Sequence, residues 1–130
     1  MTLSASLRDL RDLLEGVETQ QGPRFRHGRT DDEDEGRFAD RVFFLNLISR
    51  LGPADTGIQP RVLYTAEVRL QHAPGGVDDF ADMERLANES ATLARTIEES
   101  SLEMLVEPVT FERTTETHVA TIPVRILVRE

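Results

Sequence analysis

Several residue types are missing from this chain, and each absence excludes a class of site. The 130 residues contain no cysteine, which excludes disulfide scaffolds, thiolate metal sites and cysteine nucleophiles. Lysine is also missing, because all 15 basic residues are arginine. No apolar run is long enough to span a bilayer, and the first residues lack the basic and apolar regions of a secretory signal. We therefore expect a single soluble, intracellular domain with enough residues to bury a core.

The charge of the chain is strongly biased toward acid. It has 24 acidic residues and a formal net charge of −9. Broad binding to DNA or RNA is therefore not expected, because attraction to phosphate requires a cationic surface. The exclusive use of arginine is typical of a GC-rich genome. It also fits a protein rich in subunit contacts, since guanidinium groups pair with carboxylates through two hydrogen bonds.

Two stretches have the spacing of amphipathic helices. In residues 3–17, apolar side chains recur every three or four positions, with charged residues between them. The second helix is expected to begin after Asp78 or Asp79, which suit an N-cap, and to end near Ser100. Its inward-facing stripe consists of Phe80, Met83, Leu86, Ser90, Leu93 and Ile97. Each helix has one such stripe, so both are expected to pack on one face of a sheet.

Alternation of apolar and polar residues predicts the strands. The last stretch, His118–Glu130, alternates with period two and predicts a strand at the end of the chain. A polar turn at residues 114–117 joins it to a strand at Met104–Arg113, so the two form a hairpin. A third long strand is predicted at Arg61–His72. Pro123 favours an edge position for the last strand, because proline cannot donate to a ladder.

The region before residue 61 is less regular. It predicts a short strand at Pro23–Gly28, a buried strand within Arg37–Ile48 and a loop over residues 51–60, with a helical turn near Asn46–Leu51 as an alternative end of the second strand. The expected fold class is α+β in the order α-β-β-β-α-β-β. Its mostly antiparallel sheet has four to five strands, with two helices packed on one face.

No catalytic motif is present. A nucleophile elbow is missing, and Gly75 and Gly76 precede a helix whose first residues are acidic, which opposes phosphate binding. His27, His72 and His118 lie near predicted strand ends without the spacing of helical metal ligands, although two of them can meet across a sheet. We expect ordinary polar positions for them, with His118 facing water, and neither an enzyme nor a cofactor.

A block of five consecutive acids is the candidate interaction loop. It consists of Asp31, Asp32, Glu33, Asp34 and Glu35. Mutual repulsion favours exposure of these side chains, and the block lacks the alternating ligand spacing of a calcium loop. The sequence predicts a solvated loop, and leaves a partner-facing acidic patch and a cation site as alternatives.

Three arginines on the predicted strands are candidate subunit contacts. They are Arg69, Arg113 and Arg125. The simpler interpretation is that each pairs with an acid on a neighbouring strand. The acids available for this are Glu67, Glu107 and Glu112.

The order of these elements resembles the tail-terminator family of long-tailed bacteriophages, also described as minor tail protein U-like or tail-completion proteins. The resemblance covers nearly the full chain and lies in its pattern. The segments that carry it are the helix from Leu3, the interrupted strands from Arg24 to Leu45, the strand Val62–Leu70, the helix Asp78–Glu99 and the strand Val119–Ile126.

The resemblance implies a structural virion protein at the head-proximal end of a tail, assembled in the host cytoplasm. Such proteins form a homo-hexameric ring that stops growth of the tail tube and provides a docking surface for the head. The implied partners are further copies of the chain, the tail tube protein and a head-completion or connector protein. DNA only passes through the channel, which the acidic loop would line or face away from, and no membrane is involved. The alternatives are a head–tail connector or neck protein, a cap of a contractile injection system, and a cytoplasmic dimeric ligand-binding or adaptor domain.

Overall fold

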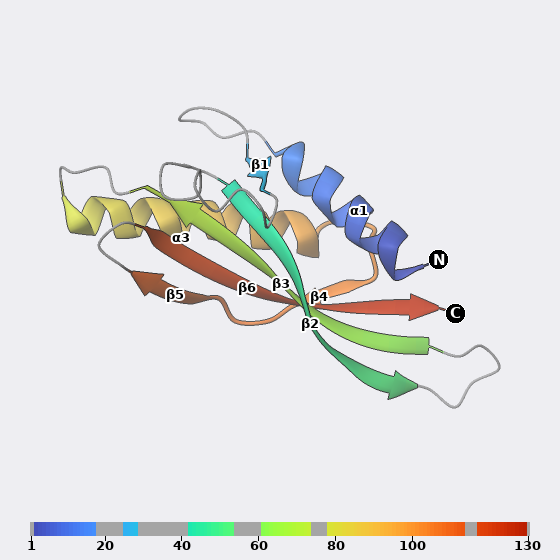
Figure 1. The fold of residues 1–130 in the computed structure, drawn as a ribbon. Coiled ribbons are helices and arrows are strands. Elements are labelled where there is room, and N and C mark those ends of the chain that lie inside the picture. Colours follow the sequence, from blue (N-terminus) through green and yellow to red (C-terminus); the bar gives the residue numbers. More distant parts are fainter. Residues whose placement is uncertain are drawn as a thin grey trace.

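The structure is a computed structural model that describes residues 2–17, 25–28, 42–53, 61–73, 78–113 and 117–129. These residues form an α+β domain with two helices, which confirms the expected fold class (Figure 1). Its elements are α1 (Leu3–Glu15), β1 (Arg26–His27), β2 (Val42–Pro53), β3 (Arg61–His72), α3 (Asp79–Glu98), β4 (Met104–Val106), β5 (Thr110–Arg113) and β6 (His118–Arg129).

All described strands belong to one sheet. Its order is β1-β2-β3-β6-β4, and β5 pairs with β6 along the same edge as β4. β1 runs parallel to β2, and every other pair is antiparallel. The sheet has six segments, of which β1 contains only two residues, so five longer strands remain, in agreement with the expected mostly antiparallel sheet.

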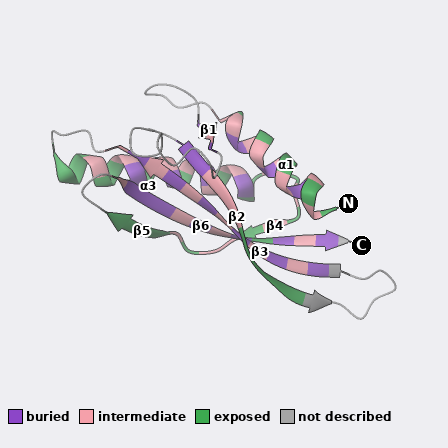
Figure 2. Ribbon diagram, viewed as in Figure 1, coloured by how far each residue is buried: buried purple, intermediate pink, exposed green. Residues whose placement is uncertain are grey.

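The core lies between one face of this sheet and the two helices. On β3 and β6, every second residue points to that face and is buried (Figure 2). Leu10 and Leu14 of α1, with Leu93 and Ile97 of α3, are completely buried against it. Each such side chain stabilises the fold by about 1.5–3 kcal/mol. The expected packing of both helices on one face is confirmed. The predicted inward stripe of α3 is wrong at its first two positions, because Phe80 and Met83 are exposed and burial begins at Leu86.

Both helices begin at a side chain that accepts a hydrogen bond from the first turn. The hydroxyl of Thr2 accepts from the backbone N–H of Ala5 at 3.1 Å. The carboxylate of Asp78 accepts from the N–H of Phe80 at 2.9 Å, so the predicted cap at this position is confirmed. These bonds satisfy donors that have no partner within the helix, and they fix where each apolar stripe begins.

Pro123 does not mark an edge of the sheet, which corrects the prediction from sequence. β6 is central, and Pro123 lies opposite Glu67 of β3. Its carbonyl accepts a hydrogen bond from the N–H of Glu107 at 2.9 Å, so its ring nitrogen faces the same neighbour. Residues 107–109 interrupt the ladder there, between β4 and β5. A break of this kind is one of the few places where a sheet tolerates proline.

The predicted strand Met104–Arg113 is divided into two. Val106 of β4 is opposite Val124 of β6, whereas Thr110 of β5 is opposite Thr121, so the register slips by one residue between them. The slip is a β-bulge, in which residues 107–109 face only two residues of β6. β2 also departs from expectation, because it continues as a strand to Pro53 and the alternative helical turn does not form.

Gly28 permits the close approach of β1 to β2. It is buried, and a Cβ at this position would lie 2.6 Å from Cε1 of Phe44 and 2.7 Å from Cγ1 of Val42. We expect Gly28→Ala to lower the free energy of unfolding by about 1–3 kcal/mol through overpacking, as measured by urea denaturation. The matched control is Gly16→Ala after α1, where the nearest atoms are 3.5 Å away and the change should stay within about 0.5 kcal/mol. Equal stability of the two variants would contradict the close packing.

Candidate functional site

The bulge between β4 and β5 decides which side chains of this edge face the helices. Met104 and Val106 lie opposite core residues of β6, so even-numbered positions of β4 point to the core. After the slip, Phe111 lies opposite the buried Ala120, so odd-numbered positions of β5 point to that side. A shift of one residue reverses the faces of a strand. The bulge therefore directs an aromatic ring toward α3.

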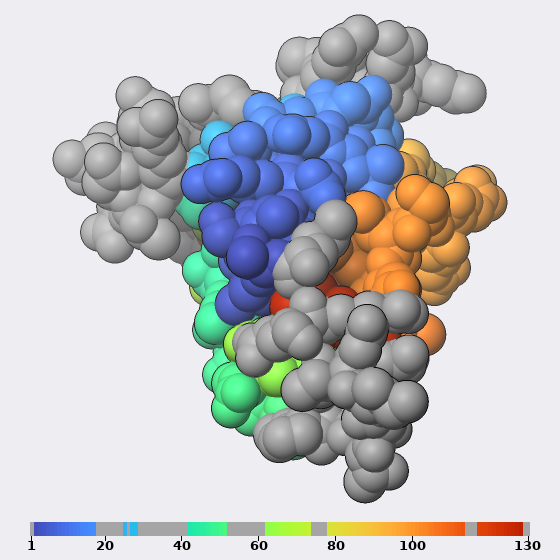
Figure 3. All heavy atoms as spheres, turned by 90° about the vertical axis from the view of Figure 1, so that its right-hand side faces the viewer, coloured from blue at the N-terminus to red at the C-terminus, as the bar shows by residue number. Residues whose placement is uncertain are grey.

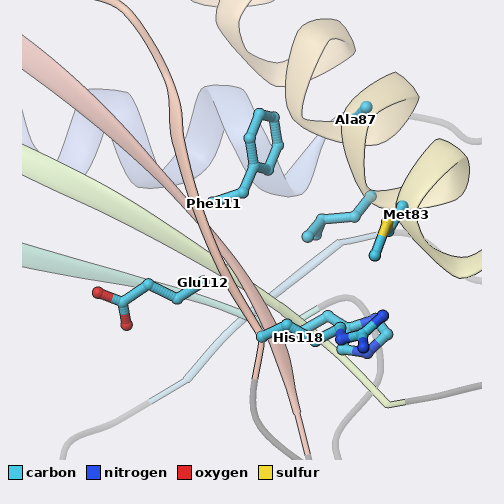
Figure 4. A pocket seen from close by; sticks show the side chains of 7 residues that line it. Met83, Ala87, Phe111, Glu112 and His118 are labelled. Atoms are coloured by element: carbon cyan, nitrogen blue, oxygen red, sulfur yellow. The ribbon is translucent and has the colours of Figure 1, made fainter. Parts of the chain in front are cut away.

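The ring of Phe111 forms one wall of an open groove of about 370 Å³, here called the edge groove. The other wall is the first half of α3, and the groove is lined by Met83, Leu86, Ala87, Phe111, Glu112, Arg113 and His118. Figure 4 shows Phe111 and Met83 on facing sides, while the carboxylate of Glu112 points away. α3 packs on β6 and β4, and the groove occupies the space between α3 and β5.

The edge groove is apolar but not closed. Phe111 is 53% exposed and Met83 is 43% exposed, while Leu86 at the base is buried. At one end, Arg113 forms an ion pair with Asp79 at the start of α3, with 3.4 Å between Nη1 and Oδ2. An exposed pair of this kind contributes little to stability, so this end of the groove is held only weakly.

Beneath this end of α3, polar groups join the helix to the sheet. His72 at the end of β3 is buried and lies directly opposite His118 of β6, which is also buried. Nε2 of His72 is 2.6 Å from Oε2 of Glu89, so a buried imidazole and a largely buried carboxylate are in direct polar contact. One turn earlier, Nη2 of Arg85 donates to the carbonyl of Ala73 at 2.9 Å. These contacts fix the part of α3 that forms the groove wall.

Two histidines therefore meet across the sheet, as the sequence allowed, but His118 does not face water. It is only 3% exposed because α3 covers the end of β6. His27 of β1 is partly buried, and its ring lies 5.4 Å from that of Phe43. Within the described ranges, no three histidine, aspartate or glutamate side chains come together in a way that would hold a metal ion.

The three candidate arginines lie at separate places. Arg69 and Arg125 are on the face of the sheet opposite the helices, and Arg125 forms an ion pair with Glu107, as the cross-strand interpretation predicts. Arg113 is at the end of the edge groove, and its described partner is Asp79 rather than a strand residue. The structure does not bring these arginines together. The candidate loop of Asp31, Asp32, Glu33, Asp34 and Glu35 lies outside the described residues.

A second exposed apolar surface lies on the opposite edge of the sheet. It consists of Leu47 and Ile48 of β2, each at least half exposed, and is here called the hairpin patch. Leu51 is also half exposed, but it lies opposite Leu63 and so points to the other face of the sheet. Figure 3 shows that the green end of the β2–β3 pair extends beyond α1. β1 pairs only with Val42 and Phe43, so no other described strand occupies the outer edge of β2 beyond them.

Neither surface was predicted from the sequence. The signals were present, because Pro108 interrupts an apolar run before Phe111, and Ile48 follows Leu47 without a polar residue between them. A bulge places one residue outside the ladder, and sequence alternation alone does not show which one.

No family model matches the chain, and no curated protein matches it. Within the described part of the chain, no helix is long and apolar enough to cross a membrane.

The contact between Glu89 and His72 is expected to stabilise the groove wall. We expect Glu89→Ala to lower the free energy of unfolding by about 1–3 kcal/mol, because the buried imidazole loses its partner. The control is Glu84→Ala, an exposed acid on the same helix, for which a change within about 0.5 kcal/mol is expected. Urea denaturation measures both, and coincident unfolding curves would show that the buried contact contributes nothing.

Proposed function

We propose that this chain is a ring-forming structural subunit of a phage-like tail. In this role the ring caps the head-proximal end of the tail tube, stops its growth and presents the joining surface for the head. The ring is supported by one observation in particular. Two unlike apolar surfaces, the edge groove and the hairpin patch, lie on opposite edges of one sheet.

Opposite and unlike surfaces favour head-to-tail association. A two-fold dimer uses the same surface on both subunits, whereas a contact between different surfaces leaves one of each free on every copy. Further copies then add until the rotation between neighbours closes a ring. Bonding between sheet edges is a common mode of assembly, because an edge strand presents unpaired N–H and C=O groups.

The position of the ring in a tail rests on the resemblance of the chain's pattern to tail-terminator proteins. The net charge of −9 supports a subunit around a DNA channel, since a negative wall repels phosphate and does not retain the passing strand. The face of the sheet opposite the helices carries polar and charged side chains, including Glu67, Arg69 and Arg125, and suits contact with another protein ring or with water.

The ring is tested by native mass spectrometry and negative-stain imaging of the concentrated protein. We expect closed six-fold particles with a central hole, in equilibrium with monomers. Monomers alone, or only two-fold dimers, up to millimolar concentration would overturn the proposal of a self-assembling ring.

The position in the tail is tested by deleting the gene from the particle that encodes it. We expect tail tubes longer than those of the parent and not joined to heads, because their growth is no longer stopped. A matched strain with a silent substitution should give tubes of normal length. Normal joined tails in the deletion strain would contradict the proposed role.

A further inference from the structure

We propose that the edge groove of one copy holds the hairpin patch of the next copy. In this arrangement, β2 of the neighbour lies along β5, and its Leu47 and Ile48 enter the space beside Phe111. The inference rests on the proposed function, because it names the contact from which the ring would be built. Each copy then carries both halves of the contact: the edge groove is the receiving surface, and the part of β2 with the hairpin patch is the inserting segment.

The receiving surface has the form that such a contact requires. The groove of about 370 Å³ is comparable with the small end of pockets that hold drug-sized ligands, roughly 300–1,000 Å³, and suits one or two aliphatic side chains. Phe111 and Met83 line it and remain about half exposed in the single chain. β5 borders the groove at the outer edge of the sheet, so a strand added there would place alternate side chains against these two residues.

A bulge in β2 exposes the inserting segment. In β2, Leu47 is opposite Ala66 and Ser49 is opposite Thr65, so Ile48 is the extra residue of a bulge. The backbone of a bulged residue bends out of the ladder, and Ile48 is 55% exposed. Leu47 points to the helix side of the sheet but is 50% exposed, because this end of the hairpin extends beyond the helices.

Charge complementarity favours a second copy as the occupant. Between residues 42 and 53, the only charged side chain is Arg50, which is exposed. The opposite edge, residues 103–113, carries three acids and one arginine, and the start of α3 beside the groove adds three acids and Arg85. Asp79 pairs with Arg113 and Glu107 pairs with Arg125, and the border keeps a net negative charge beyond these pairs. A mainly apolar strand with one positive charge thus matches an apolar groove with an acidic border.

Disulfide capture tests this contact directly, because the chain has no cysteine of its own. The full-length double variant Ile48→Cys with Ala87→Cys places one thiol on the inserting segment and one in the groove. Mild oxidation should give a ladder of covalent oligomers, since each copy carries both halves of the contact. An equimolar mixture of the two single variants should give heterodimers and no longer species. Capture also traps transient contacts, so the result does not depend on a stable ring.

Three further variants identify the surfaces. Combining Ile48→Cys with Arg8→Cys moves the second thiol to an exposed position on α1 and should abolish the ladder. Adding Phe111→Asp to the original pair should reduce its yield at least about tenfold, because a charge in an apolar contact removes a central anchor. Adding Phe80→Asp should leave the yield unchanged, since Phe80 is 79% exposed but does not line the groove. Circular dichroism confirms that each variant is folded.

The outcomes separate this inference from the proposed function. A ladder from the original pair that responds only to Phe111→Asp supports the contact, even where imaging shows open chains and the tail role fails. Closed rings without the ladder would overturn the contact and leave the proposed function standing. If the groove instead binds a small molecule or a different protein, the variant with Ile48→Cys and Ala87→Cys should form no more covalent oligomers than the Arg8→Cys control. This result too would overturn the inference.

Discussion

The antiparallel pairing of β3 with β6 is the contact on which the rest of the domain depends. Twelve residue pairs, from Arg61 opposite Arg129 to His72 opposite His118, run without a break in register. Because both strands alternate strictly, this pairing produces one continuous apolar face in the middle of the sheet. α1 and α3 bury their stripes against that face, and β2, β4 and β5 extend the sheet on both sides. A slip of one residue in this pair would turn the apolar face away from the helices.

The irregular parts of the sheet are all at its edges. β2 has one register shift at Ile48 and a second between Leu51 and Pro53, and the edge formed by β4 and β5 has one next to Pro108, whereas the central pair has none. Bulges interrupt an edge ladder and so reduce unselective pairing with other chains. Two of these bulges also change which side chains lie at the surface: the one in β2 exposes Ile48, and the one between β4 and β5 turns Phe111 toward α3. Bulges thus restrict pairing along the sheet edges and also determine which apolar side chains remain exposed for contact with another chain.

The position of α3 links the core to the edge groove. Its inward stripe holds it over β6 and β4, while Glu89 and Arg85 fasten it to the end of β3. The helix consequently cannot move toward β5 without breaking buried polar contacts, and the space beside Phe111 stays open. The groove therefore results from two features at once: a bulge that turns Phe111 to the helix side of the sheet and a helix that is anchored elsewhere.

The sequence by itself determined the elements that depend on local periodicity and on residues near in the chain. The spacing of leucines predicted α1, Asp78 predicted the start of α3, and strict alternation predicted β3 and β6 within a residue or two. It also predicted an α+β domain with both helices on one face, because each helix had a single apolar stripe. These features require only that each segment meets some apolar surface. They can therefore be predicted without knowing which other segment supplies that surface.

Only the tertiary structure decided the order of the strands, the central position of β6 and both exposed surfaces. Pro123 suggested an edge because a proline lacks an N–H, but the bulge that accommodates it lies on another strand. His118 was predicted to face water because it lies beside a turn, but α3 covers it. Phe111 and Leu47 are apolar residues in strands, and their sequence context does not show that each stays about half exposed. Such outcomes depend on which segment lies next to which, and that is fixed by packing between residues distant in the chain.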